Sequence, residues 1–364
     1  MFARELQGAC NVVGVGLADE IEKIKSRKIK IVRGNGAPAA LDAKTIVSED
    51  FGITIKSNPP DFLCVAARNP VDKVVEFYYR HFADAKNVPA LILSQNGLSA
   101  IEDARRGLQK ALGQDADKVQ IIRVSLINGI DLEVKAASAS VSAGQDGTSI
   151  IKYKLPIKLG FGAAGEDSKS KCKVDKVAPC RLQQGTTLGE GEALHKQGTT
   201  LGGVGNLKKV FDKAGIEARE FRAKEVLAME NAKLFLNLIG MACAVEGVDV
   251  GAGWQNKEIF KKEIAMLKEF AAAVKKSGGG FADNLGGYPV KLFASLVFLP
   301  IWLLSPFRGF FAKVIAKGRN RPKDLSEIDY YNGEVVRLGK RGGAATPINR
   351  EIIQKSKESK SNYK

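Results

Sequence analysis

Residues 90–98, Ala-Leu-Ile-Leu-Ser-Gln-Asn-Gly-Leu, are the stretch from which the fold of this chain can first be inferred. The first four are apolar, which is typical of a strand buried on both faces of a parallel sheet. The Gln-Asn-Gly that follows is typical of a sharp turn. Because open α/β sheets bind ligands at the carboxyl ends of their strands, Asn96 and Gly97 are candidate ligand-binding residues as well as turn residues.

Segments of the same kind alternate with segments of helical periodicity through the first part of the chain. Strands are expected over residues 11–16, 28–32, 61–67, 90–95 and 119–125, and helices over residues 18–27, 70–83 and 98–112. This alternation predicts a mainly parallel sheet covered by helices. Two further β segments, 134–143 and 150–159, are joined through Gly-Gln-Asp-Gly, and we expect them to extend the sheet as antiparallel strands.

The rest of the chain divides into an insertion and a helical region. Residues 166–205 are rich in Gly, Lys, Gln and Thr and contain Gln-Gly-Thr-Thr-Leu-Gly twice, so they are interpreted as an insertion or linker. Helices are then expected over residues 206–214, 222–246, 257–277, 290–304, 306–316, 326–340 and 347–357. The predicted organisation is an α/β nucleotide-type domain (1–165), an insertion (166–205) and a helical domain (206–364).

The amino-acid composition limits which kinds of functional site we expect in this chain. The chain has five cysteines, none in a CxxC pair, which favours a reducing compartment without a disulfide framework. Only two histidines are present, so we expect neither a catalytic metal nor a histidine-based serine triad. The longest apolar run, 292–304, is too short to span a bilayer and contains Pro300. We therefore expect a cytoplasmic protein without a transmembrane segment.

The net charge of +16 admits nucleic acid, an acidic membrane or anionic small molecules as partners. Much of this charge lies in a cluster at residues 23–30 and in the tail at residues 355–364. A solvated face and a tail account for such clusters without a polyanion. We do not expect nucleic acid to be the main partner.

Residues 232–239, Ala-Lys-Leu-Phe-Leu-Asn-Leu-Ile, place one lysine and one asparagine in an apolar helical run. Lys233 and Asn237 are four residues apart and so share one helix face. Apolar neighbours desolvate an ammonium and lower its pKa, which suits a general acid for a carbonyl substrate. The alternative is that the lysine stem packs on apolar surface while its head reaches water.

A second run, Arg-Pro-Lys-Asp-Leu-Ser-Glu-Ile-Asp-Tyr-Tyr-Asn-Gly-Glu-Val-Val-Arg-Leu-Gly, covers residues 321–339. Asp324 and Glu327 fit a variant of the capping box, so Glu327 taken alone is a candidate helix cap. Residues 346–349, Thr-Pro-Ile-Asn, fit a threonine cap with proline at the first helical position.

Together these motifs resemble the ketopantoate reductase (2-dehydropantoate 2-reductase) family. The resemblance rests on Gln-Asn-Gly at 95–97, Lys-x-x-x-Asn at 233–237, the run 327–339 and Thr-Pro-Ile-Asn at 346–349. It covers nearly the whole chain except the insertion. It implies a Rossmann-type domain followed by an all-α domain, with NADP(H) and a small-molecule 2-oxo acid in the cleft between them.

The resemblance also implies roles for individual residues. Lys233 would protonate the ketone oxygen while NADPH delivers hydride to the carbonyl carbon. Glu327 would hold the substrate hydroxyl, Asn237 would position the substrate, and Asn96 would lie near nicotinamide and substrate. The implied reaction is the reduction of 2-dehydropantoate to pantoate, in pantothenate and coenzyme A biosynthesis.

The amino-terminal end departs from this pattern. A Rossmann domain opens with a strand and a GxGxxG loop, whereas residues 1–7 look like the helix that follows such a loop. Residues 11–16 are then the second strand, and the Rossmann domain is incomplete at its amino-terminal end. In the competing interpretation they are the first strand, and Arg33 binds the 2′-phosphate of the cofactor.

Other cofactor contacts follow from the resemblance. Gly97 belongs to the expected cofactor site, and the lysine expected after the strand at 61–67 falls on Ala67, so Arg68 is the candidate substitute. Leu17 falls where an arginine is expected, which leaves NADP or NAD open.

Three other functions stay open. The chain could reduce a different 2-oxo acid, or it could be a non-catalytic or truncated member that acts as a binding or interaction protein. The third is a basic protein that binds nucleic acid or a membrane surface through residues 23–30 and 292–311. A homodimer is also left open.

Overall fold

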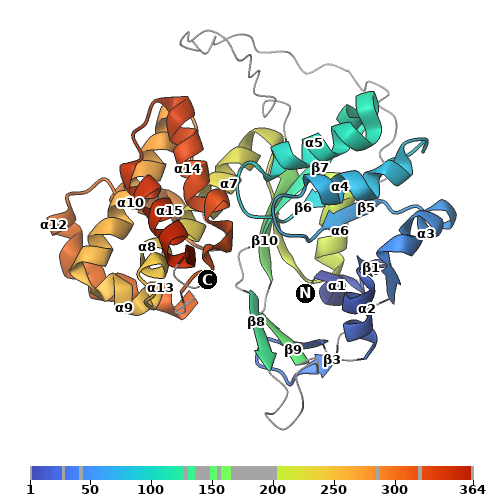
Figure 1. Cartoon of the computed structure of the whole chain (residues 1–364), viewed down its shortest axis with the longest axis horizontal. Helices are drawn as coiled ribbons and strands as arrows, with labels where there is room; N and C mark the ends of the chain where they lie inside the picture. The colour runs from blue at the N-terminus through green and yellow to red at the C-terminus, as the bar shows by residue number, and fades with distance from the viewer. Residues whose placement is uncertain are drawn as a thin grey trace.

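Residues 2–26, 29–40, 44–126, 130–135, 148–153, 157–164, 203–283, 287–318 and 322–361 are described by the computed structural model. An α/β domain and a helical domain lie beside each other (Figure 1). Most of the expected insertion, residues 166–202, lies outside the described residues. So do both Gln-Gly-Thr-Thr-Leu-Gly copies, Cys172, Cys180 and His195.

The main sheet has the strand order β11–β10–β7–β6–β5. Strands β5 (Phe62–Val65), β6 (Ala90–Leu93) and β7 (Ile121–Leu126) are parallel, whereas β10 (Lys158–Ala163) runs antiparallel to β7 and β11 (Glu217–Glu220) runs parallel to β10. All four residues of β6 are buried. The parallel arrangement expected from the apolar run at residue 90 is confirmed.

Each face of β6 packs against a different core. Leu91 and Leu93 join a cluster with Val75 of α4 (Asp72–Tyr79) and Leu108 of α5 (Ala100–Leu112). The alternate residues of β6 face the cluster of α6 (Val204–Lys213), which includes Phe211. A strand between two helical layers has no polar face, which is why its sequence is an unbroken apolar run.

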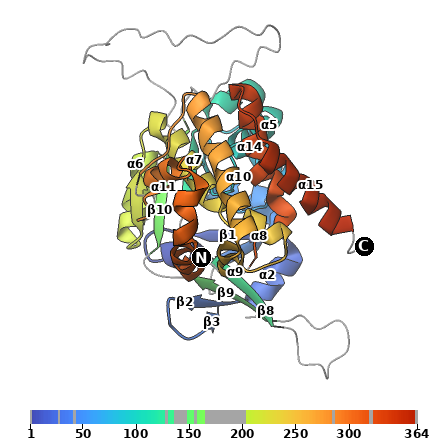
Figure 2. The ribbon, with the colours of Figure 1, turned by 90° about the vertical axis from the view of Figure 1, so that its left-hand side faces the viewer.

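The six other strands in the described residues form two smaller sheets. Strand β1 (Val13–Gly16) pairs in parallel with β4 (Lys44–Val47). A four-stranded sheet has the order β3–β2–β9–β8, from β3 (Ala39–Ala40), β2 (Ile29–Arg33), β9 (Thr148–Tyr153) and β8 (Ile130–Lys135). It lies below the main sheet in two views (Figure 1 and Figure 2). Helices α1 (Phe2–Leu6), α2 (Ala18–Lys25) and α3 (Phe51–Ser57) complete this part.

The expected antiparallel extension is therefore only partly correct. Strands β8 and β9 are antiparallel to each other, but they lie in the separate sheet, where β9 pairs with β2, and of the expected segments only β10 joins the main sheet. Residues 136–147, which contain the expected turn, lie outside the described part of the chain. Local alternation predicts a strand but does not specify its partner, because pairing is a long-range contact.

The parallel sheet is interrupted between β1 and β5. Within the described residues, β1 pairs only with β4, and β5 pairs only with β6, so each has one unpaired edge. Both strands line the same cavity of about 1740 Å³, and Cys64 in the middle of β5 is exposed to it. In a doubly wound sheet, strands numbered along the chain lie side by side in the order 3-2-1-4. Here β4 matches strand three, β1 matches strand two and β5 matches strand four. The gap lies at the place of strand one, in agreement with residues 11–16 being the second strand.

The helical domain surrounds a third core. Its helices are α7 (Ala223–Leu238), α8 (Met241–Val245), α9 (Val250–Gln255), α10 (Lys257–Lys276), α11 (Val290–Leu296), α12 (Ile301–Leu304), α13 (Arg308–Gly318), α14 (Ile328–Gly342) and α15 (Pro347–Ser361). The domain begins at α7 rather than at residue 206, because α6 and β11 pack on the main sheet. Helical periodicity shows which face of α6 is buried but not which domain buries it.

The helix expected over residues 222–246 is divided at Gly240, which has a φ of 91°. Three backbone N–H groups after this break, those of Gly240, Ala242 and Cys243, donate to the buried carboxyl of Glu263. By length and composition, residues 223–245 could cross a membrane, but 67% of the apolar window is buried inside the fold. This stretch is the central helix of the domain core.

We predict that Gly240→Ala destabilises the protein by about 2 kcal/mol, because an L-residue is strained at this φ and the new methyl lies near Val250. Its Cβ would lie 2.9 Å from Val250 Cγ2. Gly247 has a similar φ of 67° but open space around it, so Gly247→Ala is the matched control and should cost about 1 kcal/mol. Urea unfolding measures both, and equal losses would contradict the packing argument.

Candidate functional site

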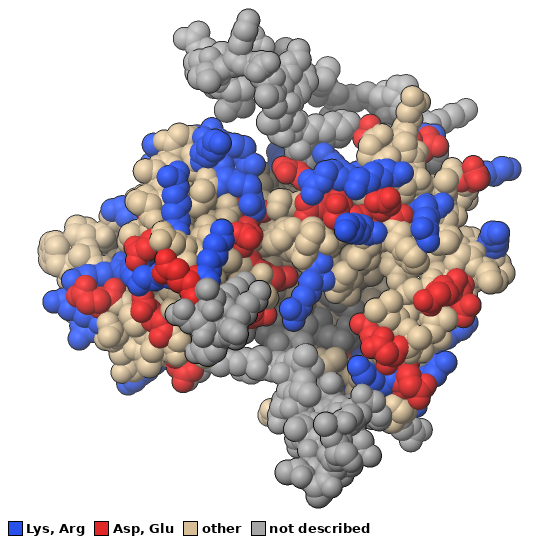
Figure 3. Space-filling model, in the orientation of Figure 1, with Lys and Arg blue, Asp and Glu red and all other residues tan. Residues whose placement is uncertain are grey.

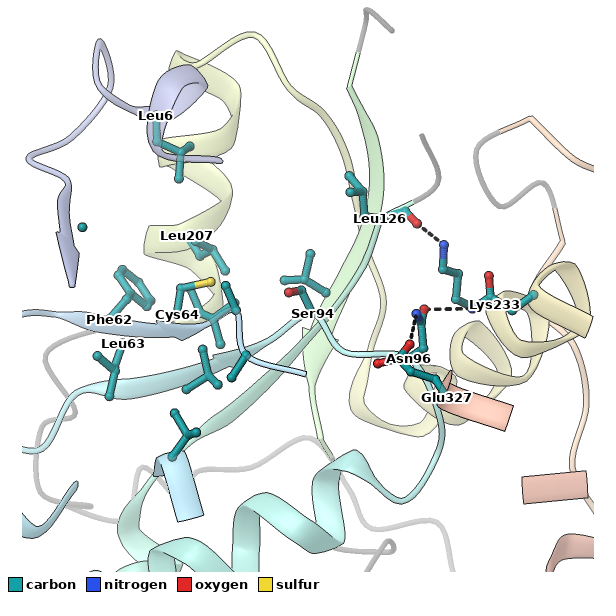
Figure 4. A pocket seen from close by; sticks show the side chains of 18 of the residues that line it. Leu6, Phe62, Leu63, Cys64, Ser94, Asn96, Leu126, Leu207, Lys233 and Glu327 are labelled. Carbon is teal, nitrogen blue, oxygen red and sulfur yellow. Dashed lines mark hydrogen bonds between the residues drawn. The ribbon is translucent and has the colours of Figure 1, made fainter. Parts of the chain in front are cut away.

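Four polar side chains meet where the carboxyl end of β6 faces the helical domain (Figure 4). The Asn96 amide nitrogen donates to the Tyr331 hydroxyl at 2.9 Å and to Glu327 Oε2 at 3.4 Å. Its amide oxygen accepts from Asn237 Nδ2 at 2.9 Å. The Tyr331 hydroxyl donates to Glu327 at 3.2 Å. The structure thus brings together three residues predicted for the site, although Asn96 and Glu327 are 231 positions apart.

Lys233 lies on the same wall of the cavity, one turn before Asn237 on α7. Its ammonium donates to the carbonyl oxygen of Leu126, the last residue of β7. Burial lowers the pKa of Lys233 to about 8, and the charge of Glu230 opposes this shift in part. The expected desolvation of this lysine is therefore present, and its ammonium is held by the carbonyl of Leu126.

A second lysine, Lys323, binds the carboxyl end of α7. The Lys323 ammonium donates to the carbonyl oxygens of Asn237 and of Leu236, the latter at 3.4 Å. Carbonyl groups in the last turn of a helix lack intrahelical partners and carry partial negative charge. Lys323 therefore connects the segment before α14 to the helix that carries Lys233 and Asn237.

The turn after β6 is fixed by its own contacts. The Gln95 side chain donates to the carbonyl oxygens of Val65 and Ala67 at 2.7 and 3.0 Å, and Asn69 donates to the Asn96 carbonyl at 2.7 Å. Gly97 has a φ of 92°, and a Cβ there would lie 3.0 Å from Tyr330. Glycine is required at this position both for the backbone conformation and for the approach of α14.

Helix α14 is also bound to α5. The Ser99 backbone N–H, just before α5, donates to Glu334 at 2.8 Å, and the Tyr330 hydroxyl donates to Asp103 at 2.9 Å. A carboxylate is stabilised at a helix N-terminus by the backbone donors there. These contacts fix α14 against the α/β domain, and Glu327 lies immediately before this helix.

A buried ion pair lies beneath the cluster. Arg123 of β7 is 1% exposed and donates to Glu230 of α7, and it also donates to the Gln95 carbonyl at 2.8 Å. Glu230 accepts a further hydrogen bond from Ser125 at 3.0 Å. The sequence analysis did not identify Arg123, Glu230 or Tyr331. A single arginine in the apolar strand Ile-Ile-Arg-Val-Ser-Leu was the available signal.

Two expected cofactor contacts lie elsewhere. Arg33 pairs with Glu5 through two hydrogen bonds of 2.8 and 2.9 Å at the end of β2, and Tyr153 donates to the same carboxylate. Arg33 does not line the cavity, and neither does Arg68, which is exposed. Lys73 of α4 does line the cavity. The structure therefore does not bring Arg33 or Arg68 to the cluster. The sequence could not predict this, because the partner of a surface arginine is not determined by its neighbours in the chain.

The amino-terminal end of α2 does not offer an anion site. Asp19 and Glu20 occupy its first turn, and the Leu17 N–H donates to Glu20 at 3.1 Å. A phosphate there would face two carboxylates instead of free backbone donors. This disfavours the interpretation in which residues 11–16 and the loop after them bind pyrophosphate.

No protein-family model matches the chain, and no curated protein matches its sequence. Among solved structures, it matches D-mandelate dehydrogenase with NADH and anilino(oxo)acetate at a TM-score of 0.60 and 15% identity, over 99% of this chain and 94% of that one. A PanE/ApbA family ketopantoate reductase from Ralstonia eutropha JMP134 matches at 0.59 and 14%, over 98% and 93%.

The 2-dehydropantoate 2-reductase from Geobacter metallireducens GS-15 matches at a TM-score of 0.57 and 15% identity, over 98% of this chain and 95% of that one. At these identities the comparison establishes the fold. The chain has a Rossmann-type α/β domain followed by a helical domain, as expected from its sequence.

We predict that Arg123→Met destabilises the protein by about 3 kcal/mol, because it leaves the Glu230 carboxylate buried without its partner. The double variant Arg123→Met/Glu230→Met should recover most of this loss. Lys118→Met, which removes an exposed pair with Asp115, is the control and should cost less than about 1 kcal/mol. Denaturant unfolding tests this, and additive losses in the double variant would show that the two charges are not coupled.

Proposed function

We propose that this chain is a nicotinamide-dependent oxidoreductase of the ketopantoate reductase type that reduces a small 2-oxo acid, with 2-dehydropantoate as the first candidate substrate and NADPH as the first candidate cofactor. The observation that carries the proposal is the convergence of Asn96, Asn237 and Glu327 with the desolvated Lys233 in one cavity. The shared fold with ketopantoate reductases supports it.

Lys233 is suited to act as the acid. Reduction of a ketone builds negative charge on its oxygen, and an ammonium in a desolvated site stabilises that charge and then transfers a proton. With a pKa of about 8, Lys233 is mostly protonated at neutral pH yet is a stronger acid than an ordinary lysine. The Leu126 carbonyl fixes where the ammonium lies, so its proton can be directed at one position in the cavity.

Glu327 and the two asparagines are suited to position the substrate. Glu327 accepts hydrogen bonds from Asn96 and Tyr331, which hold its carboxylate at the cavity wall. A carboxylate oriented in this way can accept the hydroxyl hydrogen of a 2-oxo acid that carries a hydroxyl group. Asn237 lies one turn from Lys233, so it can orient the substrate relative to the acid.

The cavity fits one end of a dinucleotide better than the other. A bound nicotinamide would supply the hydride, and the carboxyl end of β6 with Asn96 offers the place for it next to Lys233. The pyrophosphate end needs backbone donors at a helix N-terminus, and α2 does not provide them. We infer that full cofactor binding requires a strand and a glycine loop in the gap between β1 and β5.

Loss of the acid should be visible in the rate. We predict that Lys233→Ala lowers kcat by about 10²- to 10⁴-fold with the fold retained. The rate of ketone reduction in the unaltered protein should fall as pH rises through about 8, because the protonated acid is lost there. Lys224→Ala, on an exposed position of α7, is the matched control. A turnover close to that of the unaltered protein in Lys233→Ala would remove the lysine from this role.

Cofactor binding can be tested on the chain as it stands and on a version extended before Phe2 by an apolar strand and a GxGxxG loop. We predict that the extension increases NADPH affinity by at least about tenfold and that replacing its glycines by alanine removes the gain. Fluorescence titration with NADPH and NADH, followed by addition of 2-dehydropantoate, measures this. Failure of both folded forms to bind either nucleotide would overturn the proposal and favour the non-catalytic alternative.

A further inference from the structure

Exposed apolar side chains are concentrated at one end of the helical domain. Of the twelve large hydrophobic residues that are exposed in the described part of the chain, nine lie between Tyr288 and Val314. Trp302 is 69% exposed, Phe310 64% and Phe307 59%. These residues come from α11, α12 and α13 and from the turns that join them, and we call this surface the α11–α13 face. A concentration of this size marks an interaction site.

The α11–α13 face is the outer side of an amphipathic layer. The inner side of the same layer is packed, since Phe311 contacts Trp254 and Phe260, and Phe293 contacts Phe311. Phe310 and Phe311 are adjacent, yet one is exposed and the other is half-buried in the core. The outward apolar residues are therefore additional to those that the core requires.

The α12 part of the face lies at the end of the molecule farthest from the α/β domain, whereas Tyr288 and Val314 also line the cavity. Helix α12 projects at that end (Figure 1), and the same end shows an area without charged side chains (Figure 3). A flat partner could reach α12 without meeting the α/β domain. A partner bound at α12 would therefore not cover Lys233 and Glu327, which lie on a different part of the molecule.

The charged residues of the segment that carries this face have one sign. Residues 284–323 contain seven Lys or Arg residues and no Asp or Glu. Lys291 and Lys313 are exposed beside the apolar side chains of α11 and α13. On the face of the molecule shown in Figure 3, acidic and basic side chains are interspersed over both domains, including next to the uncharged area at the α12 end. This segment therefore combines exposed apolar side chains with basic residues and no acidic ones.

This combination favours an anionic lipid surface over a second copy of the chain. A two-fold dimer would place the basic border of one copy against the same border of the other, which is repulsive. Helices that lie in a membrane interface carry Trp, Phe and Leu on one side and Lys or Arg beside them, and anionic headgroups attract the basic residues. The helices of this face are too short to cross a bilayer, and Pro300 separates two of them.

We propose that the α11–α13 face docks on a bilayer that contains anionic phospholipids, with Trp302, Phe307 and Phe310 inserted at the level of the headgroups. This docking is independent of the reductase activity proposed above, because it uses no residue of the Lys233 and Glu327 cluster.

Co-sedimentation of the full chain with vesicles tests the proposal. Binding is expected to vesicles that contain phosphatidylserine, and it should weaken strongly in high salt and on pure phosphatidylcholine. Trp302→Ser/Phe310→Ser and Lys291→Glu/Lys313→Glu should each lower the partition coefficient by about tenfold or more. The control is Ile53→Ser/Leu227→Ser, which removes two exposed apolar side chains from other surfaces and should bind like the unaltered protein.

A second readout reports the contact itself. The chain has two tryptophans, and Trp254 is 3% exposed, so a blue shift in emission on adding anionic vesicles should come from Trp302 and be absent in Trp302→Phe. Absence of vesicle binding, or equal loss in the Ile53/Leu227 control, would overturn the proposal. A dimer that dissociates in Trp302→Ser, with no binding to vesicles, would overturn it in favour of a self-association surface.

Discussion

The buried ion pair between Arg123 and Glu230 is the interaction on which the geometry of the site depends. It joins β7 of the α/β domain to α7 of the helical domain, and the same arginine holds the carbonyl of Gln95. One side chain therefore fixes the turn that carries Asn96 relative to the helix that carries Asn237. A buried pair gains little net stability, since desolvation offsets its attraction. Its contribution here is positional, because Arg123 and Glu230 can both be satisfied only when strand, turn and helix have this arrangement.

The same pair influences the chemistry of Lys233, which follows Glu230 by one turn of α7. Burial lowers the pKa of the lysine, and the carboxylate raises it in part. Because Arg123 already neutralises Glu230, the carboxylate cannot act as a full counter-ion for the ammonium. Among the described residues, the lysine is thus kept in a desolvated site without a dedicated acidic partner. That is the condition under which an ammonium remains charged near neutral pH and still releases a proton readily.

Local patterns in the sequence predicted most of the helices and strands, whereas the residues of the cluster were assigned to one site by the resemblance to a known family. The apolar run at residue 90, the Lys233 and Asn237 pair and the segment at Glu327 each follow from a short periodicity or motif, and the structure brings them together. What the patterns could not specify is pairing between distant segments. Three contacts illustrate this: β2 with β9 in a separate sheet, Arg33 with Glu5, and Arg123 with Glu230. The partners in these contacts are 28 to 120 residues apart. The break at Gly240 was missed for a different reason, because a single left-handed residue does not disturb apolar periodicity on either side.

Because of the gap between β1 and β5, the two ends of the cavity differ in how fully their polar groups are paired. At the end near β6, the side chains that would act on a substrate are connected to one another and to both domains. At the end near β1, the unpaired edges of β1 and β5 face the cavity, and the helix that follows β1 is already capped by Glu20. Unpaired edges of parallel strands are costly to leave exposed, because their backbone groups lack partners and can pair with other chains. A parallel strand placed there would satisfy both edges and carry a loop to the amino-terminal end of a helix. In the proposed function, substrate positioning would depend on contacts within the described residues, and cofactor affinity would depend on a strand and loop in this gap, so the two properties could be altered separately.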